Sequence, residues 1–265
     1  MTSAVRARAS STHKRVPVRG KTLPEQVYRL HSKLIRRIND THIFVQQAVR
    51  LLLDAKQRYV ESKDPDDKPY DVPAHGKSGV VKRSDAQLRE IYDRYIATDL
   101  YSNLLVTIVS LCESFLFEVL RLVLQAHPEK MTINVQGVAL NRTVDIDTVL
   151  NAMTIRDARL SIIDQRLHAV SYAKPADYLR FLQHVAHITT NDDAFAEYVE
   201  IKATRDIIVH SAGIANSIYT TKVGPKARVD AGVRLPMDAD YFNHCVATVK
   251  RIAVIVKEDI EQHFT

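Results

Sequence analysis

Apolar residues recur every three or four positions through most of this chain, which predicts long amphipathic helices. A first helix is predicted over about residues 23–62, with a capping box at its start and a break or bend near residues 39–41. A second spans residues 84–126, and its apolar positions form two neighbouring stripes, so it is expected to pack on more than one side. Further helices are predicted at about residues 146–170, 175–187, 191–213 and 238–263.

Three stretches interrupt the helical pattern. Residues 63–84 are rich in Pro, Gly and Asp, which predicts a long loop of a length that is uncommon inside a compact protein. Residues 129–145 alternate weakly between apolar and polar and indicate either a short hairpin or an extended loop. Residues 217–235 carry turn residues between short apolar runs, as in a small β-hairpin. The pattern therefore favours an all-α bundle with long central helices and a small β-hairpin insertion.

The chain has 265 residues, only seven glycines and no tryptophan, as expected for one helical domain over residues 23–265. The formal charge is +6, but residues 1–22 hold six Lys or Arg residues and no acid, so the remainder is electrically balanced. Residues 1–22 are expected to be a disordered basic tail, which either attracts RNA weakly or is only a solvated terminus. A basic folded domain of the DNA-reading kind is not indicated.

Several classes of protein are disfavoured. Cys112 and Cys245 lie in apolar helical surroundings and are expected to be buried free thiols in a reducing compartment. No secretory h-region is present, and the apolar run at residues 104–124 contains three charged residues, which favours a core helix over a membrane span. The expected location is cytoplasmic. No metal is expected, because the histidines in the middle of the chain lack neighbours at ligand spacing: His168, His184 and His187.

The predicted helix that ends near Gly213 carries the candidate chemistry. Asp206 and His210 are four residues apart, so they are neighbours on one helical face, and Arg205 lies on the flank of the same surface. A permanent cation, a carboxylate and an imidazole therefore converge at the C-terminal end of a helix, and this combination suits chemistry on a phosphate.

This arrangement resembles the HEPN superfamily, in which Arg is often followed by a polar residue and, four to six residues later, by His. The residues after His210 resemble the sequence that closes this helix in RiboL-PSP-type HEPN domains, and residues 110–121 resemble the long core helix of the family. The resemblance implies an up-and-down helical bundle and a homodimer whose two motif helices face each other across one cleft. It also implies a metal-independent endoribonuclease, with a toxin or an antiviral defence effector as its role.

RNA supplies its own nucleophile, the 2′-hydroxyl, so cleavage requires a base, an acid and positive charge at the phosphate. His210 suits either proton role, and Arg205 suits the charge. Asp206 either orients the imidazole or holds Arg205 in place. Glu113, on the polar strip of the central helix, either faces this site or serves an ion pair within the bundle. The expected partners are RNA, a second copy and an antitoxin or defence protein, with no cofactor and no membrane.

Two other interpretations remain open. The protein is a non-catalytic interaction or dimerisation module, with His210 as a helix cap and Arg205 paired with Glu200 or with an acid from another helix. Alternatively, it is an RNA-binding protein that uses its basic tail, in which case deletion of residues 1–22 removes binding.

Overall fold

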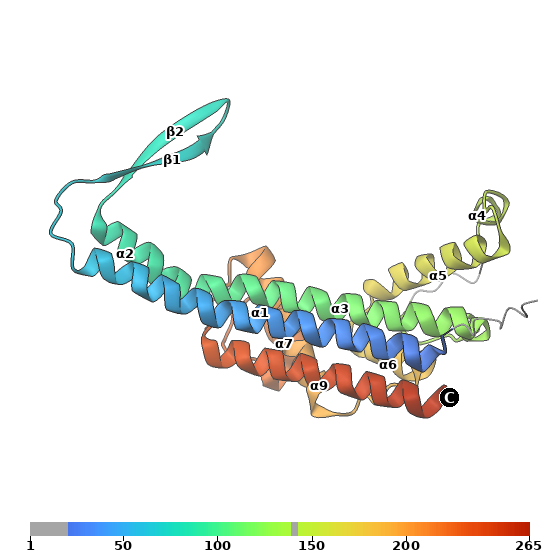
Figure 1. Ribbon diagram of the computed structural model, residues 1–265. Coiled ribbons are helices and arrows are strands. Elements are labelled where there is room, and N and C mark those ends of the chain that lie inside the picture. The colour runs from blue at the N-terminus through green and yellow to red at the C-terminus, as the bar shows by residue number, and fades with distance from the viewer. Residues whose placement is uncertain (1–20, 139–142) are drawn as a thin grey trace, which may run out of the picture.

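The computed structural model describes residues 21–138 and 143–265, and it is helical apart from one small hairpin. Three long helices run side by side through the molecule: α1 (Leu23–Val60), α3 (Leu100–Ala126) and α9 (Ala239–His263) (Figure 1). A fourth, α7 (Asp193–Ser211), packs against α3 and α9. The prediction of an all-α bundle with long central helices and a small β-hairpin is therefore confirmed.

Helix α1 begins at the predicted capping box. The Thr22 hydroxyl accepts a hydrogen bond from the Glu25 amide, and the Glu25 carboxylate accepts one from the Thr22 amide. The predicted break near residues 39–41 is wrong, because the helix continues through them. Asn39 and Asp40 are exposed, and the Thr41 hydroxyl donates to the Arg37 carbonyl, so polar groups are accommodated on the outer side without opening the helix.

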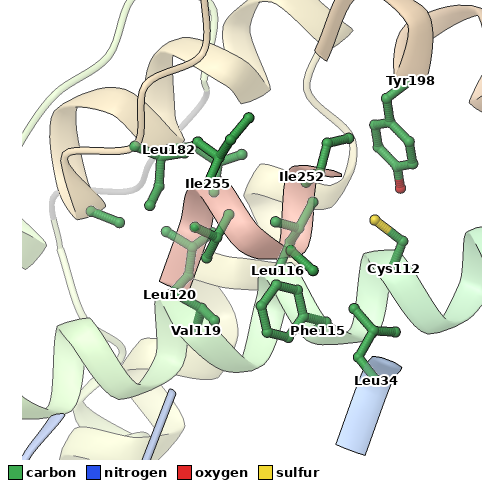
Figure 2. Packing of buried hydrophobic residues seen from close by; sticks show 14 of the residues in the cluster. Leu34, Cys112, Phe115, Leu116, Val119, Leu120, Leu182, Tyr198, Ile252 and Ile255 are labelled. Atoms are coloured by element: carbon green, nitrogen blue, oxygen red, sulfur yellow. The ribbon is translucent and has the colours of Figure 1, made fainter. Parts of the chain in front are cut away.

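The central helical run comprises α2 (Asp85–Arg94), a π-helical turn (Tyr95–Asp99) and α3. Ser84 caps its start, at the residue where the sequence predicts that this helix begins. Both apolar stripes of α3 contribute buried side chains, because α1, α7 and α9 and the helices at one end of the bundle surround it. Figure 2 shows side chains from several of these helices packed around α3, including Leu34 of α1, Tyr198 of α7 and Ile252 of α9.

The loop predicted at residues 63–84 contains the β-hairpin. Strands β1 (Lys68–Ala74) and β2 (Lys77–Arg83) pair antiparallel around a two-residue turn, and they project beyond the end of the bundle (Figure 1). Gly76 adopts φ 72° in that turn, a conformation that favours glycine. The sequence predicted a loop here because proline disfavours strands. Both prolines of β1 are tolerated because this sheet has two strands, so that β1 is an edge strand.

The two positions where a hairpin had been considered contain no strand in the described residues. The stretch after α3 forms a 3₁₀-helix (Pro128–Thr132), and residues 139–142 lie outside the described part. Residues 217–223 form helix α8 (Ser217–Val223), capped by Asn216, so the predicted hairpin there is wrong. A single bridge joins Ile214 to Arg234. The remaining elements are α4 (Ile146–Leu150), α5 (Ile155–Ser171), α6 (Pro175–Ala186) and a 3₁₀-helix (Gly224–Lys226).

Helix α6 begins where the sequence places it, whereas the helix predicted at 146–170 is divided into α4 and α5 by a turn at residues 151–154. The run Asp85–Ala126 is long and apolar enough to cross a membrane by length and composition alone. In the structure its apolar side chains instead supply much of the bundle core, an arrangement compatible with a soluble protein.

Candidate functional site

The site is built on the C-terminal half of α7. Asp192 caps the start of this helix, within one residue of its predicted start. After Ser211 the chain leaves the helix through two left-handed residues, Ala212 at φ 49° and Gly213 at φ 81°. Arg234 donates a hydrogen bond to the Ala212 carbonyl at 2.9 Å, so this exit is fixed by the later bridge segment.

Arg205 is held by two carboxylates. Its Nη2 lies 2.6 Å from an oxygen of Glu113 on α3, and its Nη1 lies 3.0 Å from an oxygen of Asp206. The other Glu113 oxygen binds Lys202, one helical turn before Arg205. Glu113 therefore faces the motif helix and also forms an interhelical ion pair, which joins the two roles that the sequence left open. Of the two pairings considered for Arg205, the structure contains the one with an acid from another helix, whereas Glu200 pairs with Arg228.

Asp206 lies between two cations. Besides Arg205, it accepts a contact from Lys222 Nζ of α8 at 3.0 Å. It makes no hydrogen bond to His210, so in this structure the carboxylate holds Arg205 rather than the imidazole. Lys202, Arg205 and Lys222 bring three positive charges to this cluster against two carboxylates. The cluster therefore keeps one positive charge in excess.

His210 occupies the last turn of α7 and is exposed to solvent. Its ring makes no hydrogen bond, ion pair or ring contact with the described residues, so it is not the helix cap. The chain around it also exposes apolar side chains. Val209 is 50% exposed and Ile218 is 72% exposed. We refer to the apolar side chains of this region as the α7-end patch: Val209, Ile214, Ile218 and Val233.

A buried ion pair joins α7 to the segment that follows α8. Glu200 on α7 is 6% exposed, and Arg228 Nε lies 3.0 Å from its carboxylate. The hydroxyls of Tyr219 and Tyr241 donate to the same carboxylate at 2.9 Å and 2.7 Å. The Arg228 guanidinium also lies over the Tyr241 ring, 3.4 Å from its centroid. This network ties α8 and the start of α9 to α7, and it thereby fixes the segment that carries Lys222.

The other candidates lie away from this site. His168 contacts the Tyr172 ring, and His187 stacks on His263 with a centroid distance of 5.3 Å. No group of three or more potential metal ligands occurs among residues 21–138 and 143–265. Cys112 and Cys245 are buried and free, as predicted. Burial raises the pKa of each thiol to about 12.

Sequence reasoning missed Lys202, Lys222 and Arg228. Lys202 had a usable signal, because it lies three residues before Arg205 and therefore on the same side of the helix. Lys222 and Arg228 carried no such signal in the sequence, because their segment was predicted to be a hairpin. They approach α7 only through the tertiary fold. No family model, no curated protein and no solved structure matches this chain.

Proposed function

We propose that this protein is a metal-independent endoribonuclease of the HEPN type, with Arg205 and His210 as its catalytic residues. One observation carries the proposal: a guanidinium fixed by two carboxylates lies in the same helix end as a solvent-exposed histidine that has no partner within the described chain. A fixed cation and a free imidazole, both within reach of solvent, are what phosphate chemistry at neutral pH requires.

In the proposed reaction the 2′-hydroxyl of a ribose attacks the adjacent phosphorus. The base removes the 2′-proton, the P–O5′ bond breaks, and the acid protonates the departing 5′-oxygen. The products are a 2′,3′-cyclic phosphate and a 5′-hydroxyl. Arg205 stabilises the negative charge that develops on the phosphorane-like transition state, and Asp206 and Glu113 restrict the motion of its guanidinium.

One chain provides one motif histidine, whereas the reaction uses both a base and an acid. A second copy would supply the other histidine. The α7-end patch supports this part of the proposal, because exposed apolar side chains before and after His210 in the sequence suit a self-complementary contact. In such a dimer two His210 rings and two Arg205 guanidiniums share one cleft.

The proposal is tested by incubating the purified protein with structured RNA in the presence of EDTA. We expect 2′,3′-cyclic phosphate ends from the wild-type protein and none from Arg205→Ala or His210→Ala. Matched controls are His184→Ala and Arg159→Ala, which remove exposed residues of the same types on other helices. Circular dichroism establishes that the variants are folded. Cleavage by His210→Ala at the wild-type rate would refute the assignment.

A non-catalytic interaction module is the second candidate. One observation favours it: Arg205 contacts an acid from another helix, and both of its terminal nitrogens are engaged by carboxylates. Under this hypothesis the Arg205 cluster only joins α7 to α3. Arg205→Lys separates the two candidates, because it keeps the positive charge while losing bidentate phosphate binding. A nuclease would lose most of its activity, whereas a dimerisation module would retain its oligomeric state in size-exclusion chromatography.

The free thiols fit a cytoplasmic protein, and we propose that location. An enzyme that cleaves cellular RNA also requires restraint, so we propose that an antitoxin or defence partner controls it. A protein that covers the α7-end patch would block both the histidine and the self-association.

A further inference from the structure

The first turns of α1 present a row of cations to solvent. Arg29, Lys33, Arg36 and Arg37 are all exposed, and they lie on the side opposite the buried residues of the same helix. Arg29, Lys33 and Arg36 follow one another at about one helical turn, or roughly 5.4 Å along the axis, and Arg37 is the neighbour of Arg36. We call these four residues the α1 basic face.

The charges of the α1 basic face are not neutralised within the described chain. None of its four side chains forms an ion pair or a side-chain hydrogen bond with a described residue, whereas Lys56, further along the same helix, binds Asp93. Two acids flank the face in sequence: Glu25, which is engaged by the Thr22 amide, and exposed Asp40, which forms no ion pair with a described residue. Residues 1–37 contain ten Lys or Arg residues and one acid, although the whole chain has a formal charge of only +6. The rest of the molecule is therefore net negative.

We propose that the α1 basic face is an RNA-binding surface, distinct from the cleavage site, that contacts phosphates of the RNA backbone. Four unpaired cations on a rigid helix bind a polyanion because each contact releases condensed counterions. Three of the four are arginines, which bind phosphate with two parallel hydrogen bonds. The choice of RNA among polyanions rests on the proposed function.

An anionic membrane is the main competing polyanion. A helix that binds at a membrane surface inserts apolar side chains between the lipids. The exposed residues between Arg29 and Asp40 are all polar or charged, and the apolar side of these turns is occupied by the core. Exposed large apolar side chains of α1 occur only outside this stretch, the nearest at Tyr28, Ile43 and Phe44. The cations themselves have no exposed apolar residue between them, which fits a phosphate backbone better than a bilayer.

The surface and the catalytic site belong to different parts of the bundle. The α1 basic face lies in the first half of α1, whereas His210 lies in the last turn of α7, which packs against α3, α8 and α9. We infer a division of roles. The α1 basic face holds one segment of the RNA, and the motif helix acts on another. Short oligonucleotides that cannot reach both places are then poor substrates.

The test measures binding rather than cleavage. Full-length His210→Ala protein, which cannot cut RNA under the proposed mechanism, is titrated against a fluorescein-labelled single-stranded oligouridylate at several salt concentrations. Neutralising the face with four Gln substitutions should weaken binding at least about tenfold and reduce the slope of log K against log salt by about 3. Changing the three arginines to Lys should preserve the slope. The matched control neutralises four exposed cations elsewhere and should change affinity less than about twofold: Lys63, Arg156, Arg159 and Lys174.

Three outcomes would overturn the inference. The first is wild-type affinity and salt slope in the four-Gln variant. The second is complete loss of binding on removal of residues 1–20, with no effect of the four substitutions. The third is binding to phosphatidylserine-containing vesicles in place of RNA. If no form of the protein cleaves RNA but binding still depends on the α1 basic face, the proposed function fails and this inference stands.

Discussion

Glu113 on α3 forms an ion pair with Arg205 on α7, and 2.6 Å separates Glu113 Oε2 from Arg205 Nη2. The two residues are 92 positions apart in the sequence. The same carboxylate binds Lys202, so one acid of the central helix fixes two cations of the motif helix. The side chains of Glu113 and Arg205 are only 22% and 20% exposed, and their attraction is therefore screened less than that of a surface pair. This contact links the core of the bundle to the position of the candidate catalytic guanidinium.

Replacing Glu113 with Ala should lower both stability and activity. The change leaves Lys202 and Arg205 without their shared carboxylate, and we expect a loss of about 1–2 kcal/mol in the free energy of unfolding. Urea denaturation measures this loss. Glu118→Ala is the control on the same helix. Its carboxylate is 40% exposed and pairs with Arg121, so the expected loss is below about 1 kcal/mol. Equal losses in the two variants would show that the interhelical pair contributes no more to stability than the exposed Glu118–Arg121 pair.

Arg228→Ala should be far more destabilising than any surface arginine substitution. It removes the cation from buried Glu200 and leaves an uncompensated carboxylate, which costs about 3–5 kcal/mol. Arg251→Ala is the comparison, because Arg251 is 56% exposed and pairs with Asp192 at the surface. Chemical denaturation should show a large shift of the midpoint only for Arg228→Ala. A shift below that of Arg251→Ala would contradict the prediction.

The stability of the protein should depend on His31 as the pH falls. Burial, followed by the charge of Lys257, lowers the pKa of His31 from its usual value of 6.5, and Glu258 and Glu261 oppose this only in part. Below about pH 6.5 the unfolded chain binds a proton at His31 more readily than the folded chain. Stability is therefore lost as pH falls through this region and then towards the folded pKa.

His31→Leu should lose less stability between pH 7.5 and 5.5 than the wild-type protein, by up to about 1 kcal/mol. The measurement is urea denaturation at both pH values. His75→Gln, an exposed position in the hairpin turn, should retain the wild-type pH dependence. Identical pH dependence in His31→Leu and wild type would exclude the effect.

The two cysteines should be unreactive in the folded protein. Burial raises the pKa of Cys112 and of Cys245 to about 12, so hardly any thiolate is present near neutral pH. Ellman's reagent at pH 8 should titrate no thiol in the native state and both thiols in guanidinium chloride. Rapid reaction of the native protein would indicate that Cys112 on α3 or Cys245 on α9 becomes accessible to solvent more easily than its burial implies.

The sequence predicted the regular parts of this structure because their signals are local. Caps at Thr22, Ser84, Asp192 and Asp238 marked helix starts, since each side chain bonds to an amide two or three residues away. The sequence failed at the hairpin of residues 68–83. There, pairing between two strands overrode a Pro-rich composition that favours a loop. It also failed at α8, where weak local preferences were decided by contact with α7.

For the candidate site, the sequence alone determined that Arg205, Asp206 and His210 share the end of one amphipathic helix. Helical periodicity fixes that relationship whatever the rest of the chain does. The tertiary structure decided which carboxylates hold Arg205, that Lys222 and Arg228 approach α7, and that His210 is exposed with no partner in the described chain. These contacts join residues that are distant in sequence. They depend on how the helices pack, because the spacing of residues along the sequence does not determine which helical faces contact each other.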